Sequence, residues 1–397
     1  MSMTQTQHHN VPALRFPEFS GEWETKNLGN FFTFKNGVNA NKSQYGHGHK
    51  FINVLDIIAD HPITSDSIIG SVSISEKEFK TNEVVFGDIL FQRSSETREE
   101  VGQSNVYLDK GRSATFGGFV IRGHPETELN SEYFDALLKT SKARKDITSR
   151  SGGSTRYNVG QASLSAVLVN VSTTLLEQQK IASFLSSVDR KITQLRQKKT
   201  LLQQYKKGMM QKLFSQELRF KGAQGNDFPD WERKRLGELA KITTGKLDAN
   251  AMVPEGPYRF YTCAKQHFQI DEYAFDADAL LISGNGANVG YVHHYNGKFN
   301  AYQRTYVLDG FFETILYVKF YLDFFLKRRI GIEKKDGNTP YIVMSTLSEM
   351  LISLPCPEEQ QKIADFLSSI DRKIDLVTTE LDHAKTFKKG LLQQMFI

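Results

Sequence analysis

Two stretches of the chain are almost the same: EQQKIASFLSSVDRKI at residues 177–192 and EQQKIADFLSSIDRKI at residues 359–374. Fourteen of the sixteen positions are identical, and the match resumes as KKG at residues 206–208 and 388–390. The offset is 182 residues along a 38-residue segment, with no gap. A fixed offset of this kind indicates an internal duplication.

Both copies carry apolar residues at heptad spacing, which predicts a long amphipathic helix in each copy. A helix of 38 residues would be roughly 57 Å long at ~1.5 Å per residue. Because a compact module usually begins and ends close together, we expect the two helices to form an antiparallel coiled-coil pair. Beyond their seam, Phe184, Phe366 and the apolar helix ends offer surface on which we expect helices of a partner to pack.

Shorter matches lie upstream of each helix. At an offset of 208 residues, they pair Trp23-Glu24, Leu28-Gly29 and Gly37 with Trp231-Glu232, Leu236-Gly237 and Gly245. The motif LRF also occurs twice, at residues 14–16 and 218–220. One LRF follows the first helix and the other lies near the chain's start, so we expect a circularly permuted, pseudo-two-fold molecule. Only the interiors of the two modules diverge.

Length and composition favour a soluble protein. The 397 residues suggest two or three domains, and no apolar run approaches the length of a membrane span. The first ten residues, MSMTQTQHHN, do not resemble a signal peptide. Cys263 and Cys356 lie far apart, which excludes a zinc site of thiolates and suits a reducing cytoplasm.

The net charge of +5 is concentrated in the first repeated helix. Residues 177–214 carry a net charge of +7, so the rest of the chain sums to −2. The modules are therefore not basic overall, and any DNA binding must use local patches.

Each module mixes short strand-like runs with helical stretches, which predicts an α+β fold. Polar, glycine-rich loops recur at similar places in both modules, and we align Tyr157 of one with Tyr341 of the other. Arginine, amide and hydroxyl side chains suit contacts with base edges and phosphates. The candidate DNA-binding residues are Arg93, Ser94, Thr155, Arg156 and Tyr157 in the first module, and Asn285, Asn288, Lys335, Asn338, Thr339 and Tyr341 in the second.

Motifs of catalysis are weak in this sequence. Residues 338–341, NTPY, resemble the Asp/Asn-Pro-Pro-Tyr motif of amino-methyltransferases but depart from it at the second position. The glycines at 284, 286 and 290 miss the dinucleotide-binding spacing. His293-His294 and His47 with His49 lack a further ligand at metal spacing. We expect no catalytic residue and no metal site in the chain.

Two variable modules, each preceded by W-x4-LG and followed by EQQKIA-FLSS-DRKI, resemble the specificity subunit of Type I restriction–modification systems. The resemblance covers nearly the whole chain. It implies that each module is a target-recognition domain for one half of a bipartite double-stranded DNA sequence, and that the helices set the spacing between the halves. It also implies that the helices dock two modification (adenine methyltransferase) subunits, and that restriction (translocase and endonuclease) subunits join the complex.

The resemblance further implies that this chain binds no cofactor itself, because S-adenosylmethionine, ATP and magnesium would be bound by the partner subunits. The predicted division is a disordered tail at 1–13, a target-recognition domain at 14–172, repeated helix 1 at 173–214, a linker at 215–230, a second target-recognition domain at 231–354, and repeated helix 2 at 355–397. Two alternatives stay open at this point: a free-standing DNA-modifying enzyme, and a coiled-coil scaffold whose modules bind ligands other than DNA.

Overall fold

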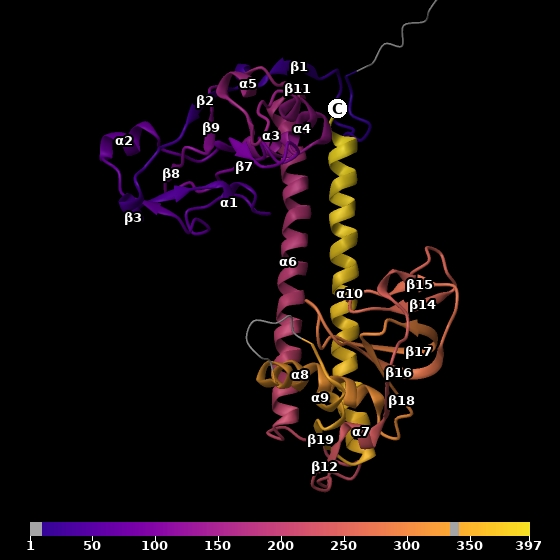
Figure 1. The fold of residues 1–397 in the computed structure, drawn as a ribbon. Coiled ribbons are helices and arrows are strands. Elements are labelled where there is room, and N and C mark those ends of the chain that lie inside the picture. The colour runs from indigo at the N-terminus through magenta and orange to yellow at the C-terminus, as the bar shows by residue number, and fades with distance from the viewer. Residues whose placement is uncertain (1–9, 334–340) are drawn as a thin grey trace, which may run out of the picture. The chain divides into compact units, whose positions relative to one another are not determined.

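The computed structural model describes residues 10–333 and 341–397. They form two compact units (Figure 1). Unit 1 holds the chain up to Leu195 together with Glu380–Ile397, and unit 2 holds Arg196–Thr379. Both long helices pass from one unit to the other, so each unit contains a segment of each helix. Within the described ranges, no helix combines the length and hydropathy that a membrane crossing requires.

Unit 1 is built on a four-stranded sheet of order β2-β9-β5-β7, with a three-stranded sheet of order β4-β3-β8 and the pairs β1-β11 and β6-β10. Its elements are β1 (Glu24–Asn27), η1 (Leu28–Asn30), β2 (Phe32–Asn36), η2 (Lys42–Gln44), β3 (Tyr45–Ile52), α1 (Val54–Ile57), β4 (Ser71–Val72), α2 (Glu76–Thr81), β5 (Ile89–Gln92), β6 (Ser94–Ser95), β7 (Ser104–Val106), β8 (Thr115–Phe116), β9 (Val120–Pro125), α3 (Ser131–Leu138), α4 (Ser141–Ser149), β10 (Tyr157–Asn158), α5 (Gln161–Ser165), β11 (Leu168–Val171), the first part of α6 (Leu175–Phe214) and the last part of α10 (Pro357–Met395).

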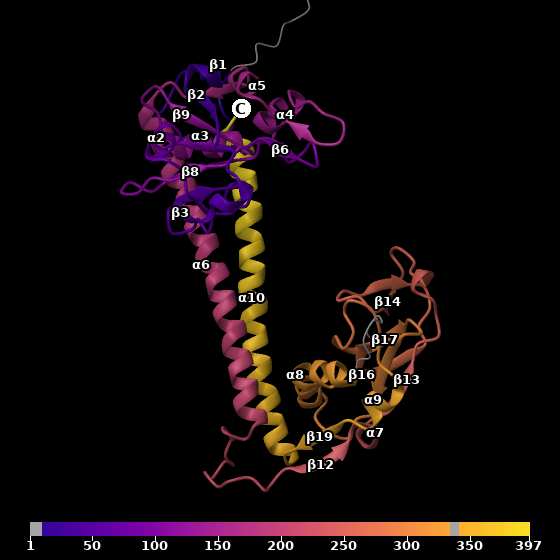
Figure 2. The ribbon, with the colours of Figure 1, turned by 60° about the vertical axis from the view of Figure 1, so that its left-hand side comes forward.

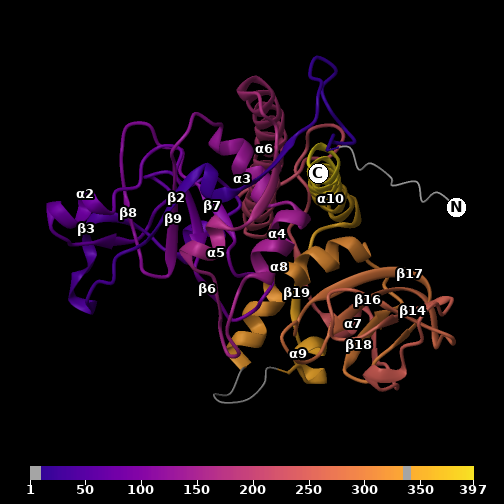
Figure 3. The same ribbon diagram turned by 90° about the horizontal axis from the view of Figure 1, so that it is seen from above.

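The core of unit 1 joins its sheet to the long helices through α3. All four residues of β5 are buried, because the strand has a neighbour on each side and a hydrophobic cluster on each face, with Ile89 and Phe91 in one cluster and Leu90 in another. Tyr133, Phe134 and Leu137 of α3 belong to the same buried cluster as Ile89 of β5 and Leu185 of α6. Figure 3 shows α3 between the strands of unit 1 and α6.

Unit 2 has one six-stranded sheet of order β13-β18-β16-β17-β14-β15 and the pair β12-β19. Its elements are the second part of α6, then β12 (Glu232–Arg235), α7 (Leu236–Leu239), β13 (Lys241–Thr244), η3 (Ala249–Ala251), β14 (Tyr258–Tyr261), β15 (Phe268–Ile270), β16 (Phe275–Ser283), β17 (Val292–Ala301), β18 (Thr305–Asp309), α8 (Ile315–Glu333), α9 (Met344–Ser348), β19 (Leu351–Leu354) and most of α10 (Pro357–Met395).

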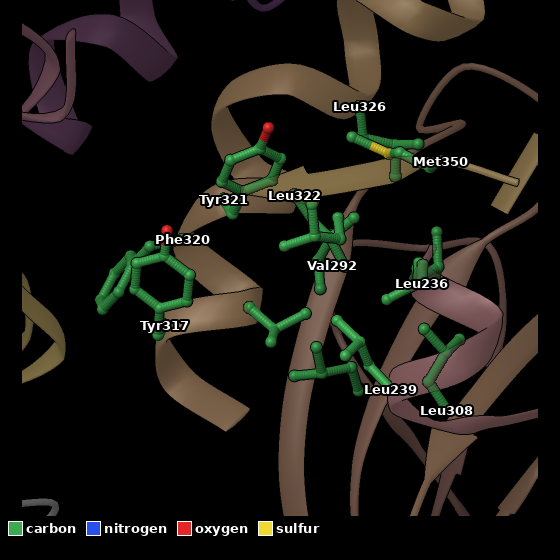
Figure 4. Close-up of a cluster of buried hydrophobic side chains, with 14 of the residues drawn as sticks. Leu236, Leu239, Val292, Leu308, Tyr317, Phe320, Tyr321, Leu322, Leu326 and Met350 are labelled. Atoms are coloured by element: carbon green, nitrogen blue, oxygen red, sulfur yellow. The ribbon is translucent and has the colours of Figure 1, made fainter. Parts of the chain in front are cut away.

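Helix α8 covers the sheet of unit 2 (Figure 2). Its 19 residues are rich in aromatic and aliphatic side chains. Two (i, i+4) ion pairs, Lys319–Asp323 and Arg329–Glu333, lie along it. Figure 4 shows Tyr321 and Leu322 of α8 gathered with Val292 of β17 and with side chains of α7, in one buried cluster. The cluster also contains Ile363 and Leu367 of α10, so the sheet, α8 and the long helix share a core.

The two long helices run antiparallel within each unit. In unit 1, Asp189 of α6 lies 2.6 Å from the Nζ of Lys388 of α10, and in unit 2, Asp371 of α10 lies 2.6 Å from the Nζ of Lys206 of α6. From the first ion pair to the second, α6 advances by 17 residues while α10 goes back by 17. Because the two aspartates, like the two lysines, are 182 residues apart, the two units contain the same ion pair. The predicted antiparallel orientation is confirmed.

The repeated motifs LRF, W and EQQ meet at the start of each long helix. In unit 1 the buried carboxylate of Glu177 accepts hydrogen bonds from Arg15 (2.6 and 2.9 Å), from the Trp23 indole (3.3 Å) and from Ser172 (2.6 Å). The Gln178 side chain accepts from the backbone N–H of Asn130. These contacts fix the helix to its module.

Unit 2 repeats this arrangement around Glu359. Its carboxylate accepts from Arg219 (3.1 and 2.8 Å) and from the indole of Trp231 (3.1 Å). The Gln360 side chain accepts from the N–H of Thr314. The repeated sequence therefore encodes a repeated junction.

The phenylalanine of each LRF packs on its own long helix. Phe16 meets Phe184, and Phe220 meets Phe366, each pair with ring centroids 5.8 Å apart. The expectation that Phe184 and Phe366 form free surface for partner helices is therefore wrong, because this chain already packs against both rings.

The chain ends confirm the permuted arrangement. In unit 2, where the chain is continuous, the N–H of Leu218 donates to the carbonyl of Lys212 (3.1 Å). In unit 1 the N–H of Leu14 donates to the carbonyl of Gln394 (2.9 Å), and Gln394 is the repeat partner of Lys212. The two ends of the chain thus take the places that one continuous segment takes in unit 2. The predicted α+β class and pseudo-two-fold organisation are confirmed.

Candidate nucleic-acid interface

The candidate loops lie at the same edge of the main sheet in each unit. In unit 1, β5 ends at Gln92, and the N–H of Arg93 donates to the carbonyl of Phe119 (2.8 Å). In unit 2, β16 ends at Ser283, and the N–H of Gly284 donates to the carbonyl of Arg304 (2.8 Å). Arg93 therefore corresponds to Gly284, and Phe119 to Arg304.

A second pair of hydrogen bonds corrects the alignment of the downstream loops. The N–H of Val159 donates to the carbonyl of Arg93 (3.0 Å), and the N–H of Ile342 donates to that of Gly284 (2.8 Å). Tyr341 thus corresponds to Asn158, and the expected match of Tyr341 with Tyr157 is wrong by one residue. Since successive residues of a strand face opposite sides, this shift changes what each tyrosine contacts.

In unit 1 the candidates Arg93, Ser94, Thr155, Arg156 and Tyr157 lie in one loop cluster. The Ser94 hydroxyl donates to the amide oxygen of Asn158, whose Nδ2 donates to the carbonyl of Arg156 (3.1 Å). Thr155 and Arg156 are exposed at the tip of this turn. The Arg93 guanidinium donates to the carbonyl of Gly118 (3.1 Å), which fixes its orientation. Tyr157 is half-buried and packs against the core of unit 1.

In unit 2 the structure brings Asn285 and Tyr341 together in an antiparallel bridge. The Tyr341 side chain is 60% exposed, so it is available to a ligand. Asn288 instead donates its amide N–H to the carbonyl of Cys263 (3.0 Å), which makes it a loop-positioning residue. The remaining candidates, Lys335, Asn338 and Thr339, lie outside the described residues.

The turn that precedes β9 in unit 1 and β18 in unit 2 belongs to the same edge and was missed by the sequence analysis. Phe119 is 63% exposed, and its counterpart Arg304 is also exposed. Arg156 and Arg304 are both exposed, so both guanidinium groups can reach an external acceptor. Asn158 was missed as well.

A signal for this turn was present in the sequence. Gly37 and Gly245 are among the residues shared by the two modules. A Cβ at either position would collide with backbone carbonyls, those of Phe116 and Gly117 at the first and those of Ala301 and Tyr302 at the second. Each shared glycine therefore lies where the backbone at the start of the exposed turn comes too close to leave room for a side chain.

His293 and His294 of unit 2 both have hydrogen-bond partners within the unit. His293 contacts the carbonyl of Ala264 (2.9 Å), and burial lowers the pKa of its imidazole, which keeps the ring neutral. His294 contacts Asp278 (2.7 Å). In the described part of the chain, no group of three or more His, Cys, Asp or Glu side chains is arranged to hold a metal ion. The edge offers guanidinium, amide, hydroxyl and aromatic groups, which can donate to, accept from and stack on a ligand.

Comparisons with known proteins agree with these features. A family model described as the Type I restriction modification DNA specificity domain matches residues 20–204 and 229–386. The specificity subunit of the Escherichia coli Type I restriction enzyme EcoDI is 39% identical over 170 residues, which cover 41% of this chain and 37% of that protein. A putative specificity subunit, MjaX of Methanocaldococcus jannaschii, is 25% identical over 97% of this chain and 95% of its own length.

Solved structures share the fold. A Type I restriction–modification S subunit from M. genitalium superposes with a TM-score of 0.65 and 16% identity, over 98% of this chain and 99% of that one. A chain from a study of assembly and conformational transition of the Type I system superposes with a TM-score of 0.55, over 94% of this chain and 97% of that one. The duplicated frame, its two variable edges and the matched family model together establish that this chain belongs to the Type I restriction–modification DNA specificity family.

Proposed function

We propose that this chain is the DNA-recognition subunit of a Type I restriction–modification complex, and that each unit recognises one half of a bipartite DNA sequence. The observation that carries the proposal is the pair of equivalent edges. The two frames hold the same junctions and ion pairs, yet they present different side chains at matching positions. Ser94, Asn158 and Phe119 in unit 1 correspond to Asn285, Tyr341 and Arg304 in unit 2. Different side chains at equivalent backbone positions suit a DNA target whose two half-sites have different sequences.

The groups at these edges match the chemistry of base recognition. Arginine pairs with the O6 and N7 atoms of guanine, and asparagine with the N6 and N7 atoms of adenine. Exposed aromatic rings such as those of Phe119 and Tyr341 can make apolar contacts with bases. Neither a free-standing modifying enzyme nor a scaffold for ligands other than DNA gains support from the family.

We assign catalysis to partner subunits and none to this chain. In this proposal, the modification and restriction subunits bind S-adenosylmethionine, ATP and magnesium. The chain itself recognises the DNA sequence and provides a surface on which these subunits dock. A titration of the purified chain with S-adenosylmethionine tests this division of labour. Stoichiometric binding of the methyl donor by the isolated chain would contradict it.

The DNA proposal predicts that one substitution alters one half-site. We expect Arg156→Ala to change or abolish recognition of the half bound by unit 1, and Arg304→Ala to do the same for the half bound by unit 2. Loss of one arginine contact should weaken binding by about 1–3 kcal/mol, roughly 5- to 150-fold. The measurement is genome-wide mapping of adenine methylation in cells that express the chain with its modification subunit.

Each of these variants is the control for the other. If both substitutions alter the same half-site, or if neither alters methylation, the assignment of one edge to one half-site is wrong. Binding of the complex to its target should also weaken steeply with salt, because cationic side chains displace counterions from phosphates. Affinity that does not change with salt would favour the scaffold alternative.

A further inference from the structure

Unit 1 contains a cavity of about 450 Å³ between α3 and the adjoining parts of α6 and α10. The apolar part of its wall consists of Ala136 of α3, Ala182 and Leu185 of α6, and Leu392 of α10. All four residues belong to unit 1. Sites for small molecules in proteins have this order of size and are mostly apolar, with a few polar groups that orient the ligand.

Helices α3 and α8 are equivalent, which shows what fills this place in unit 2. Tyr133 of α3 and Tyr317 of α8 are both fully buried, and each packs against the repeated tryptophan of its own unit, with ring centroids 6.0 and 6.2 Å apart. Three residues further along, α3 has Ala136 and α8 has Phe320. Phe320 is 2% exposed, so unit 2 places a buried aromatic ring where unit 1 has only a methyl group.

A lysine lies next to this position in each unit. In unit 2 the Nζ of Lys206 lies 4.8 Å from the centroid of the Phe320 ring, which is a cation–π contact. In unit 1 the repeat partner of this lysine, Lys388, lines the cavity. Each lysine is held by an aspartate at 2.6 Å, in the same ion pair. An electron-rich ring in the cavity of unit 1 would therefore meet an ammonium group that is already in place.

The cavity wall also contains a carboxylate whose hydrogen bonds are incomplete. Asp135 of α3 is 9% exposed, and its Oδ2 lies 2.6 Å from the Nζ of Lys139. Its Oδ1 is buried and has no hydrogen-bond partner among residues 10–333 and 341–397. Because rotation about the Cβ–Cγ bond exchanges the two oxygens, either of them can accept from a donor in the cavity. Burial raises the pKa of this carboxyl group, and the ammonium groups of Lys139 and Lys388 oppose that shift.

The charges around Asp135 favour a neutral donor over a cation. The carboxylate is already paired with Lys139, and Lys388 lies in the same wall. A further cation would be repelled by both ammonium groups, whereas a neutral N–H group would complete the hydrogen bonding of the carboxylate. Glu132, also in the wall, has a partner of its own in the hydroxyl of Ser186 (2.9 Å).

We propose that this cavity binds a small, neutral aromatic molecule with one ring N–H group, of the indole class. The ring occupies the place that Phe320 fills in unit 2, the ammonium of Lys388 faces the ring, and the N–H donates to Asp135. Among aromatic rings, indole attracts an ammonium ion most strongly. Because unit 2 supplies its own ring, the chain binds one molecule despite its internal duplication. The candidate DNA-binding residues of unit 1 do not line the cavity, so this inference does not depend on the proposed function.

The experiment is a calorimetric titration of the full chain with indole, 3-methylindole and 1-methylindole. Indole should bind at one molecule per chain. The two methylindoles have the same size, but only 3-methylindole keeps the N–H group. 1-Methylindole should therefore bind about tenfold more weakly than 3-methylindole, because it leaves the buried acceptor unpaired. The absence of saturable indole binding, or equal affinity for the two isomers, would overturn the proposal.

Two variants locate the site. Ala136→Phe places a ring in the cavity and should weaken indole binding by about tenfold or more, while the melting temperature of the chain stays unchanged or rises. Ala162→Phe is the matched control, because Ala162 is an exposed residue of α5 that does not line the cavity; it should bind indole as the wild type does.

Asp135→Leu tests the acceptor separately, with a side chain of similar size. It should abolish the difference in affinity between the two methylindoles, because the carboxylate and the N–H group act as one pair. This variant also decides the question if Ala136→Phe does not fold. Wild-type affinity for indole in folded Ala136→Phe, or a preference for 3-methylindole that persists in Asp135→Leu, would show that indole does not bind in this cavity as proposed.

Discussion

At the scale of single residues, the junctions around Glu177 and Glu359 hold each unit together. Each carboxylate is almost fully buried, and each is satisfied by an arginine and a tryptophan that come from sequence positions far away from it. A buried charge is tolerated only when an opposite charge and hydrogen bonds compensate it fully. The motifs LRF, W and EQQ therefore depend on one another, which explains why they occur together in both halves of the chain.

Glu177→Ala should destabilise unit 1 by about 3–5 kcal/mol, because it removes the carboxylate that pairs with the Arg15 guanidinium and leaves the Trp23 indole without its acceptor. Glu359→Ala should have the same effect in unit 2. Urea denaturation followed by tryptophan fluorescence measures both, since each carboxylate contacts an indole. Glu358→Ala is the control: its exposed ion pair with Lys362 should contribute less than about 1 kcal/mol. Equal losses in Glu358→Ala and Glu359→Ala would refute the junction argument.

At the scale of elements, α3 of unit 1 and α8 of unit 2 occupy equivalent places with different packing. Asp135 and Lys139 form an (i, i+4) ion pair in α3, and Lys319 and Asp323 form the reversed pair in α8. Phe320 of α8 is 2% exposed and lies 4.8 Å beneath the ammonium of Lys206. Its counterpart in α3 is Ala136, which lines a cavity of about 450 Å³ together with Lys388, the repeat partner of Lys206.

This difference predicts that a change in side-chain size has opposite effects on stability at the two equivalent positions, 320 in unit 2 and 136 in unit 1. Phe320→Ala should destabilise unit 2 by about 3–5 kcal/mol through lost burial and a new cavity. Ala136→Phe should leave unit 1 as stable or more stable, by on the order of 1–2 kcal/mol, because the ring enters existing space below Lys388. Thermal unfolding of the two single variants tests the pair. A marked loss of stability in Ala136→Phe would mean that the cavity cannot accept a ring and that the site is overpacked.

The elements also show how much of the fold and of the candidate site could be predicted from the sequence. The long helices and their orientation could be predicted, because heptad spacing is local and the duplication marks what is shared. That the shared residues meet at a junction became evident only in the structure. The residues of the turn with Phe119 and Arg304 were missed, although the shared Gly37 and Gly245 mark where the turn passes, because loop residues have no periodicity and their position depends on strands far apart in sequence. The alignment of Tyr157 with Tyr341 was wrong by one residue for the same reason: backbone hydrogen bonds between distant segments set the register. Phe184 and Phe366 were misjudged because the LRF motif was not recognised as their packing partner.

At the scale of the whole molecule, the permuted arrangement predicts that the chain can be opened at the equivalent place in unit 2 without loss of the fold. Three residues, Ser215 to Glu217, connect Phe214 to Leu218 in unit 2. In unit 1 the corresponding residues are Phe396 and Leu14, and the hydrogen bond from Leu14 to Gln394 matches the one from Leu218 to Lys212. The same three-residue connection should therefore span the gap between the chain ends in unit 1, with little loss of chain entropy because the loop is short.

We expect a circular permutant to fold and keep its DNA specificity. It begins at Leu218 and ends at Phe214, and a Ser-Gln-Glu linker joins Phe396 to Leu14. No helix or strand is cut, and the residues around Glu177 and Glu359 are all present. The measurements are the melting temperature of the permutant and its adenine-methylation pattern in the presence of the modification subunit. The control is a permutant opened within β16, whose residues from Ala279 to Ser283 are buried. The first permutant should match the wild type in both, and the control should fail to fold, since opening a central strand removes ladder hydrogen bonds from the core. A shifted or lost methylation pattern in the first permutant would show that the original termini carry a part of recognition that the pseudo-two-fold arrangement does not supply.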